Sequence, residues 1–572
     1  MGHTGKRTFR TLQKALVQRQ RRRMLRSIRQ TAELVSYQRR YDQETSSFAV
    51  PSFPGELAEH MAGSDVIYVG DFHTLLQSQK LFVRLVKLAR HRVDPTRPLL
   101  LALELFRAKD QLHVDAYLAG HTDFDELLEA VDYPHTWGFP PDGYRLILEY
   151  ARASGISVIG INSNPRVPKN RLLKRDQFAA RKLVQRLRQW PMPRIMVLIG
   201  DLHVALEHLP AAVEEEGAKS NLACRQLRIH TNPDAIFWQL SSLGLDYMVN
   251  ITKLESGAFA VTNATPLAKY ESYLRYLEGV LDDEETLDGG LSSGSLLFEE
   301  HLLDFAQHIG EFLSIPFERQ EDFEVVVSAD EMSGDREAVK QAHDWEELEV
   351  LATATALQIP VFMPHGWLLI HRLDLNEAAD CAARILLRQY QWVAPFDATV
   401  KEFHQLLIME ALAYFAAKAI NPKLTCKREA DLEKMVQELS LHPQRNPGTQ
   451  FMAEVARDHA LPHLLRVREH VVEGLPYNDT KASHRLGLRK RLLMARLVGR
   501  RLGEKLFYAA HVGAARKVRN GELLSDWPTI KDIAGWITRT PASIPNMKAF
   551  YLEICGKAAS VTEHHDSRSS WF

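Results

Sequence analysis

Two stretches of the sequence place a glycine, an aspartate and a histidine at the end of an apolar run. The first, VIYVGDFHTL over residues 66–75, contains Gly70, Asp71 and His73. The second, IMVLIGDLHVAL over residues 195–206, contains Gly200, Asp201 and His203. An imidazole can exchange a proton near neutral pH or bind a metal ion, and a neighbouring carboxylate can orient it. The repeated Gly-Asp-x-His motif therefore predicts a site for acid–base or metal chemistry.

Other polar residues follow apolar runs in the same way. Glu104 and Arg107 belong to the run LALELFR, and Asn162 ends the run SVIGIN. Ligands bind at the carboxyl ends of the strands in an open parallel sheet, because the loops there converge while the sheet stays rigid. Glycine at a strand exit allows a sharp turn, after which side chains can face back across the edge. We therefore expect these residues and both histidines at one edge of a sheet.

Two histidines and one carboxylate suit a divalent transition metal that keeps open positions for water or substrate. Such a metal makes a bound water acidic enough to attack an ester or an amide. Under this hypothesis His73, Glu104 and His203 bind the metal. Asp71 or Asp201 then orients a histidine or acts as the general base. The alternative is a purely structural role, in which each buried histidine only forms a hydrogen bond with a carboxylate at a strand end.

The elements that must position these residues follow from the pattern of residues 65–265. Apolar runs alternate there with helical patterns, which predicts successive βα units and a largely parallel sheet. The runs are continuously apolar, and this indicates strands that are covered on both faces. The fold class that we expect is α/β, a mostly parallel sheet with helices on both faces, followed by a mainly helical C-terminal domain.

The composition changes along the chain and predicts four segments. Residues 1–50 are rich in Lys and Arg and are expected to form a basic helical arm. Residues 51–280 form the α/β domain, and residues 281–295 form an acidic, glycine-rich linker. Residues 296–572 form a mainly α-helical domain of unknown role, in which only FEVVVSA and VFMPHGWLLI have the pattern of short strands.

The overall composition is that of an ordinary globular protein. The 572 residues carry a formal net charge of -1, and 45% of them are hydrophobic. This balance gives no clear nucleic-acid signal and makes a membrane surface an unexpected partner. The four cysteines lie far apart, and no run approaches the roughly 18 apolar residues of a membrane span. We expect a cytoplasmic protein with a small-molecule ligand, and the sequence leaves a homo-oligomer open.

Several ordered blocks between about residues 60 and 270 resemble the ChaN-like proteins of the haem-binding uptake and Tiki superfamily. The blocks are GDFH, ALELFRAKDQLHVDAYLAG, WGFPPDGYRLILEYARASGISVIGINSNP, LIGDLHVALEHLP and TNATPLAKYESYL. The resemblance implies an α/β domain, with haem binding for ChaN-like members and metal-dependent hydrolysis for the Tiki and TraB relatives. Their paired Gly-x-x-His motifs correspond here to Gly70 with His73 and Gly200 with His203, together with Glu104.

The sequence also departs from this family. ChaN-like sequences typically read Gly-Glu-x-His at the first motif, where this chain has the shorter Asp71. The haem-uptake members are lipoproteins, whereas the basic N-terminus here has no continuous apolar core, so we expect no lipid anchor. An inactive scaffold is therefore one of the hypotheses that stay open.

A haem group requires an axial His or Tyr, an apolar slot and basic groups for its propionates. The segment DYPHTWGFPPDGY offers Tyr133, His135, Trp137 and Tyr144 for such a slot, although aromatic residues in a loop often form local core. The sequence assigns no single iron ligand. The expected ligand pocket comprises Gly70, Arg107, Tyr133, His135, Tyr144, Asn162 and Gly200.

Three functions remain in competition. The leading hypothesis is a ChaN-like protein that binds haem or a divalent metal ion at the carboxyl ends of the strands. The alternative is a metal-dependent hydrolase in which Asp71, Glu104 and Asp201 are catalytic. The third is the inactive scaffold.

Overall fold

The computed structural model describes residues 9–91, 97–163, 170–285, 293–318, 324–327, 345–362, 367–371, 375–392, 400–441, 447–477, 486–518 and 528–559. The chain divides into two compact units. We call residues 16–283 the α/β unit. We call residues 9–15 and 284–559 the helical unit.

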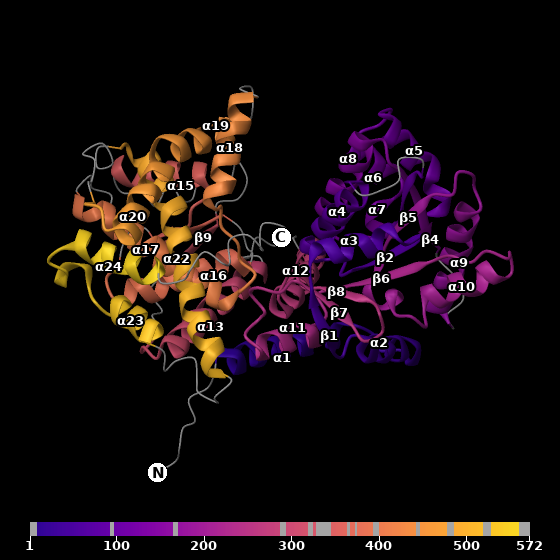
Figure 1. Ribbon diagram of the computed structural model, residues 1–572, viewed down its shortest axis with the longest axis horizontal. Coiled ribbons are helices and arrows are strands. Elements are labelled where there is room, and N and C mark those ends of the chain that lie inside the picture. The colour runs from indigo at the N-terminus through magenta and orange to yellow at the C-terminus, as the bar shows by residue number, and fades with distance from the viewer. Residues whose placement is uncertain are drawn as a thin grey trace, which may run out of the picture. The chain divides into compact units, whose positions relative to one another are not determined.

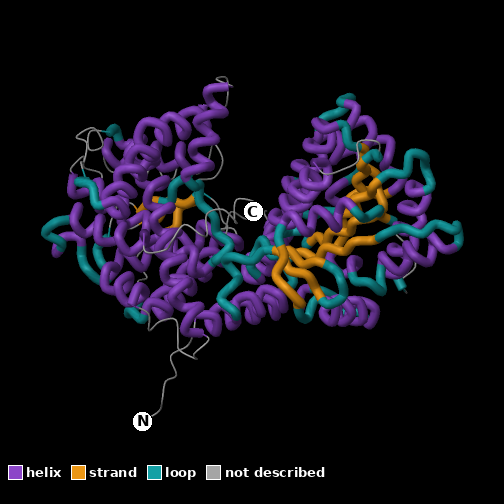
Figure 2. Tube along the Cα trace, viewed as in Figure 1, coloured by secondary structure: helices purple, strands orange, loops and turns teal. Residues whose placement is uncertain are grey.

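A mostly parallel sheet forms the centre of the α/β unit (Figure 2). Within the described residues it has eight strands, in the order β1-β7-β8-β6-β2-β5-β3-β4. The strands are β1 (Phe48–Ser52), β2 (Val66–Asp71), β3 (Leu99–Arg107), β4 (Ser157–Asn162), β5 (Arg194–Gly200), β6 (Gln226–Thr231), β7 (Ile251–Leu254) and β8 (Phe259–Val261). All neighbours pair in parallel except β7, which is antiparallel to β1 and to β8. The expected fold class is confirmed.

Helices surround this sheet (Figure 1). They are α1 (Phe9–Ser27), α2 (Ala32–Glu44), α3 (Pro54–Ala62), α4 (Leu76–His91), α5 (Gln111–Ala119), α6 (Phe124–Ala130), α7 (Tyr133–Thr136), α8 (Asp142–Ser154), α9 (Arg171–Leu187), α10 (Leu209–Ala218), α11 (Asp234–Ser242) and α12 (Pro266–Glu285). The first residues of α1, up to Ala15, and the last two residues of α12, Glu284 and Glu285, belong to the helical unit.

Alternate residues of β2 face opposite helical layers. Ile67 and Val69 lie in a buried cluster with residues of α4 and α8. Val66 and Tyr68 lie in a second buried cluster with residues of α9 and α10. Both faces of the strand are therefore buried, which explains why its apolar run is continuous and does not alternate with polar residues.

The N-terminal segment is a structural part of the α/β unit. Tyr37 and Tyr41 of α2 are buried, and β1 pairs with β7 at one edge of the sheet. The compact-unit boundary falls after Ala15. Residues 16–50 of the segment that the charge pattern predicts as a basic helical arm, residues 1–50, thus lie within the α/β unit.

The helical unit begins near the expected linker. Residues 281–285 continue α12, residues 286–292 lie outside the described residues, and the compact-unit boundary falls after Asp283. Its helices are α13 (Ser293–Leu313), α15 (Trp345–Leu357), α16 (Leu375–Gln389), α17 (Val400–Ile420), α18 (Glu429–Leu441), α19 (Pro447–Val455), α20 (Leu461–Glu473), α22 (Leu488–Val518), α23 (Pro528–Ile537) and α24 (Met547–Ala559).

A small sheet accompanies these helices. Within the described residues it contains β10 (Val361–Phe362), β11 (Trp367–Ile370) and β9 (Glu324–Val327), in that order. These strands lie in the two stretches that the sequence marks as strand-like, and the mainly helical character of the unit is confirmed. Among the helices that the structure describes, none is both long enough and apolar enough to cross a membrane.

Two glycines let α17 and α22 approach closely. A Cβ atom at Gly499 would lie 2.5 Å from the Cβ of Glu410. A Cβ atom at Gly503 would overlap the carbonyl oxygen of Ala411 and lie 3.1 Å from the backbone nitrogen of Phe415. The contact between the two helices therefore depends on the absence of side chains at these positions.

Replacing Gly503 with alanine is expected to destabilise the helical unit by about 1–3 kcal/mol, because the new methyl group overpacks the contact with α17. Gly535 of α23 is the matched control, since a Cβ atom there meets no atom within 4 Å. Gly535→Ala should instead stabilise α23, by up to about 1 kcal/mol. Thermal unfolding of both variants tests this, and a Gly503→Ala protein as stable as the wild type would contradict the packing argument.

Candidate functional site

The exit of β2 holds a histidine that is fixed by a buried carboxylate. Nδ1 of His73 lies 3.0 Å from Oδ2 of Asp71. The same carboxylate accepts hydrogen bonds from Nε2 of Gln79 at 2.5 Å and from the hydroxyl of Tyr144 at 2.7 Å. Three donors thus hold Asp71 in place, and Asp71 in turn fixes the orientation of the His73 ring.

The exit of β5 holds a second pair of the same kind. Nδ1 of His203 lies 2.6 Å from Oδ1 of Asp176, a fully buried residue of α9. The other carboxylate oxygen accepts a hydrogen bond from the hydroxyl of Tyr37, at 2.8 Å. The partner of His203 is therefore Asp176, and not the adjacent Asp201.

Glu104 lies where the ladder between β3 and β4 becomes irregular. Leu103 pairs with Gly160 and Arg107 with Asn162, so β3 carries extra residues at this point. Such a bulge changes the direction of a side chain. Oε2 of Glu104 accepts the backbone N–H of Gly200 at 2.7 Å, and Arg175 of α9 forms an ion pair with Oε1.

Gly200 lies close to both His73 and Glu104. A Cβ atom at this position would lie 3.3 Å from Nε2 of His73 and 3.5 Å from Oε2 of Glu104. The absence of a side chain therefore leaves a small space between an imidazole nitrogen and a carboxylate oxygen. The structure thus brings His73, Glu104 and Gly200 together, as the strand pattern predicts.

The charges in the site reinforce one another. Burial opposes ionisation of Glu104, but Arg175 and the two imidazoles lower its pKa to about 2. Burial lowers the pKa of His73, but its hydrogen bond to Asp71 and the charges of Asp71 and Glu104 raise that pKa above the usual value. His203 behaves in the same way, because burial is outweighed by Asp176 and Glu104, and its pKa is raised. The site combines an ionised carboxylate with two imidazoles that protonate readily.

Asp201 lies against Gly70 and does not orient a histidine. A Cβ atom at Gly70 would overlap Oδ1 of Asp201, so a larger residue there would require the Asp201 side chain to move. Oδ1 accepts a hydrogen bond from the hydroxyl of Thr231, at 3.1 Å. Burial raises the pKa of Asp201 to about 7 despite the opposing charge of Lys269, and the nearby charge of Asp71 raises it further.

Two aromatic side chains contact His73, and a third packs behind one of them. The imidazole lies 4.7 Å from the ring of Trp137 and 4.8 Å from that of Phe139, and Phe139 lies 5.0 Å from Tyr276 of α12. We call Trp137, Phe139 and Tyr276 the aromatic wall. The side chain of His73 is 23% exposed, so the wall borders an imidazole that solvent can reach.

The other residues that the sequence proposes as haem ligands have different roles. The hydroxyl of Tyr133 donates to the carbonyl oxygen of Phe139 at 2.8 Å, and that of Tyr144 donates to Asp71. Burial raises the pKa of both phenols above the usual range, which disfavours a tyrosinate ligand. The side chain of His135 is 83% exposed and pairs with Asp132.

Arg107 and Asn162 do not join the constellation at Gly200. Nε of Arg107 donates to Asp110 at 2.7 Å, and Nη2 donates to the carbonyl oxygen of Val131 at 2.8 Å. Asn162 is the ladder partner of Arg107 at the end of β4. Arg107 thus fastens the helices that follow β3.

The pattern of strand ends in the sequence did not indicate the partners that α2, α4 and α9 supply, which are Tyr37, Gln79, Arg175 and Asp176. One of them had a recognisable signal. Asp176 is the only acidic residue of α9, and it is buried with Ala180 and Leu183 on the same face of the helix. A lone carboxylate on the apolar face of a helix requires a buried partner.

A metal ion bound by His73, Glu104 and His203 gains no support from this geometry. Among the described residues, no group of three or more His, Cys, Asp and Glu side chains is placed to hold a metal ion. The carboxylate of Glu104 already has Arg175 as its counter-ion. A metal ion would have to displace this guanidinium.

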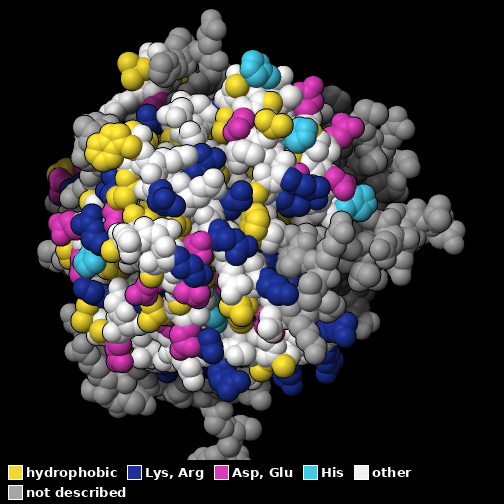
Figure 3. Space-filling view, turned by 90° about the vertical axis from the view of Figure 1, so that its right-hand side faces the viewer, with side chains coloured by type: hydrophobic (Ala, Val, Ile, Leu, Met, Phe, Trp, Pro, Cys, Tyr) yellow, Lys and Arg dark blue, Asp and Glu magenta, His cyan; other side chains and the backbone are white. Residues whose placement is uncertain are grey.

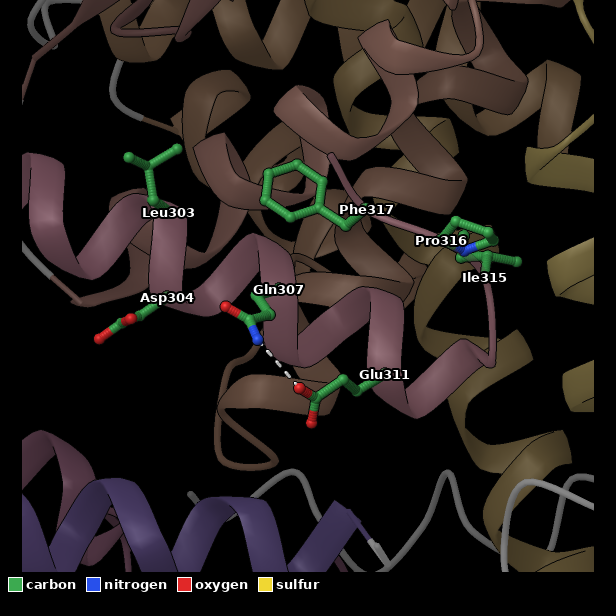
Figure 4. Close-up of a pocket in the computed structure, with 7 residues that line it drawn as sticks. All are labelled: Leu303, Asp304, Gln307, Glu311, Ile315, Pro316 and Phe317. Carbon is green, nitrogen blue, oxygen red and sulfur yellow. Dashed lines mark hydrogen bonds between the residues drawn. The ribbon is translucent and has the colours of Figure 1, made fainter. Parts of the chain in front are cut away.

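A pocket of about 360 Å³ lies elsewhere, in the helical unit (Figure 4). It is lined by α13 and the segment that follows it, between Leu303 and Phe317. Gln307 and Glu311 are joined across one helical turn by a hydrogen bond of 3.1 Å. The described residues that line the pocket include no histidine, cysteine or lysine.

Basic side chains are distributed over the surface shown in Figure 3, which is turned toward the side where Figure 1 shows α9 and α10. Arg171 and Arg181 of α9 are exposed, and so is Arg188, which follows the helix. In Figure 3, acidic and apolar side chains lie between the basic ones. The part of this face that the structure describes is therefore of mixed charge.

One family of known proteins is similar to part of the α/β unit. The family described as "Haem-binding uptake, Tiki superfamily, ChaN" matches residues 57–171. This range includes His73, Glu104 and two members of the aromatic wall, and it ends at the first residue of α9. No curated protein matches the chain.

One solved structure shows a distant likeness. It comes from work titled "Crystal structures reveal a thiol-protease like catalytic triad in the C-terminal region of Pasteurella multocida toxin". The two chains are 14% identical, the alignment covers 34% of this chain and 26% of that chain, and the TM-score is 0.22. A likeness at this level supports no inference about fold or function.

The raised pKa of Asp201 predicts how stability depends on pH. An aspartate has a pKa near 3.9 in an unfolded chain, so the folded state holds an extra proton between about pH 4 and the folded pKa of about 7. This contribution is fully present below about pH 4 and is lost as the pH rises through about 7. Urea unfolding should show the wild type losing stability relative to Asp201→Asn between pH 5 and pH 8. The exposed Asp115→Asn serves as control, and parallel curves for the wild type and Asp201→Asn would contradict the prediction.

Proposed function

We propose that the α/β unit binds haem at the carboxyl edge of its sheet, with His73 as the iron ligand. The observation that carries the proposal is a single imidazole, partly open to solvent, beside the aromatic wall. The match of residues 57–171 to a haem-binding uptake family supports the same ligand. Bound haem would supply an iron atom with an open coordination position.

The residues around His73 fit this role. Asp71 engages Nδ1, which leaves Nε2 as the nitrogen for iron and makes the imidazole a stronger donor. Trp137 and Phe139 offer apolar ring surface next to it. His203 fits less well, because its side chain is only 7% exposed.

Haem titration of purified protein tests the assignment. His73→Ala should abolish the Soret change that haem causes in the wild type, and Asp71→Asn should weaken binding about 10-fold to 100-fold, because it removes the group that orients the ligand. His135→Ala is the matched control, since His135 is exposed and lies in the segment that the sequence marks as a haem slot. A spectrum lost in His135→Ala and kept in His73→Ala would show the opposite assignment. A wild type that takes up no haem at micromolar concentration would refute the function.

A second candidate function is ester or amide hydrolysis without a metal ion. The observation that favours it is the space over Gly200 between Nε2 of His73 and Oε2 of Glu104. In this reaction His73 takes a proton from water while the water oxygen bonds to the carbonyl carbon. Arg175 stabilises the negative charge on the carbonyl oxygen. The bond to the leaving group then breaks, and His203 supplies the proton that the leaving group requires.

The pH dependence and chelator resistance of hydrolysis test the second candidate. A general base must be unprotonated, so hydrolysis of a nitrophenyl ester should fall as the pH drops below the raised pKa of His73. His73→Gln should reduce kcat about 100-fold to 10,000-fold. The exposed His113→Gln should leave kcat unchanged.

Excess EDTA separates this mechanism from a metal-dependent one. Full activity in EDTA supports Arg175 as the positive group, whereas loss of activity that zinc or manganese restores would favour the metal-dependent hydrolase. A protein that neither binds haem nor hydrolyses test esters would favour the inactive scaffold.

A further inference from the structure

We propose that Tyr37 and Asp176 are positioning residues for His203, so that helix α2 forms part of the acid–base site. The inference rests on the acid–base function proposed above, since it concerns the histidine that would act as the proton donor. It assigns a role to a segment before residue 57 and to a residue after residue 171, both outside the matched family range.

Asp176 links the histidine to the helix. Its carboxylate is fully buried, and its two oxygens serve two different partners. One accepts from Nδ1 of His203 at 2.6 Å, and the other accepts from the hydroxyl of Tyr37 at 2.8 Å. An acceptor on Nδ1 keeps the proton on that nitrogen, so Nε2 is the atom that can exchange a proton with a ligand.

The ring of Tyr37 contacts two histidines. It stacks on His208 with a centroid distance of 3.8 Å and an interplanar angle of 10°. It meets His203 edge-on at 5.8 Å. Nδ1 of His208 lies 2.5 Å from the carbonyl oxygen of Leu202, which fixes the stacked ring. The phenol therefore cannot turn away from Asp176 without breaking these contacts.

Helix α2 also holds the start of α9. The carboxylate of Glu33 accepts the backbone N–H groups of Arg171, Leu172 and Leu173, at 2.9, 2.9 and 3.1 Å. A carboxylate at a helix N-terminus satisfies donors that have no partner within the helix and interacts favourably with the helix dipole. Because α9 carries both Arg175 and Asp176, α2 sets the position of two residues of the site.

The charged groups around His203 act on its protonation in opposite directions. Asp176 of α9 and Glu104 of β3 favour the protonated imidazole, and Arg175 opposes it. The hydroxyl of Tyr37 and the ring of His208 complete the surroundings. Asp71 accepts from three donors, whereas Asp176 accepts from two.

Side-chain nitrogen NMR of His203 in the full chain tests the role without any ligand. Asp176→Asn should lower the pKa of His203 by about one to three pH units, because it removes the negative partner. Tyr37→Phe should raise that pKa, because the carboxylate loses a donor and becomes more basic, and the proton should stay on Nδ1. Tyr41→Phe is the matched control: it removes a buried hydroxyl from the same helix, and Tyr41 packs on His230 instead.

The opposite directions of the two pKa shifts of His203 distinguish a positioning role from a general loss of packing in α2. A merely structural role predicts that Tyr37→Phe and Asp176→Asn both move the pKa of His203 toward that of a solvated imidazole, and this outcome would overturn the proposal. An equal shift in Tyr41→Phe would overturn it as well. If Asp176→Asn does not fold, the other two variants still test the proposal. The pKa of His203 should rise in Tyr37→Phe and stay unchanged in Tyr41→Phe. The NMR result stands apart from haem uptake and ester hydrolysis, so failure of the proposed function would be seen separately.

Discussion

The ion pair between Glu104 and Arg175 is the interaction on which the rest of the site depends. Glu104 is 4% exposed, and a buried carboxylate without a counter-ion would be strongly destabilising. Arg175 supplies that counter-ion from α9, while the backbone N–H of Gly200 binds the second oxygen from β5. One carboxylate therefore joins a helix to two strands. Because Asp176 follows Arg175 in α9, the same contact also places the partner of His203.

The site combines groups from the two opposite faces of the sheet. Asp71 and His73 are held by Gln79 of α4 and Tyr144 of α8, which cover one face. The pair formed by His203 and Asp176 is held by α9 and α2 on the other side. A continuous sheet keeps its two faces apart, so such groups can meet only beyond its edge. Glycine at the strand ends keeps this meeting point open, as the close approach of His73 to Gly200 shows.

Several predictions from the sequence depended on rules that act over short distances. The mostly parallel sheet and the helical second unit follow from periodicity, and His73 and Glu104 approach one another because parallel strands end on a common edge. The roles given to Tyr133, His135, Tyr144 and Arg107 depended instead on where a loop would turn. Each of these side chains makes a contact that the sequence pattern does not indicate, such as the hydrogen bond from Tyr144 to Asp71.

The sequence by itself determined the fold class and the placement of the two Gly-Asp-x-His motifs at strand exits, because hydrophobic periodicity and glycine turns are local properties. Only the tertiary structure decided which partner each of these side chains has. His203 pairs with Asp176, Glu104 pairs with Arg175, and Asp176 accepts a hydrogen bond from Tyr37. These partners are separated by 27, 71 and 139 residues along the chain. Such pairings arise from the packing of α2 and α9 against the sheet edge, and a buried charge accepts whichever partner that packing brings within hydrogen-bonding distance.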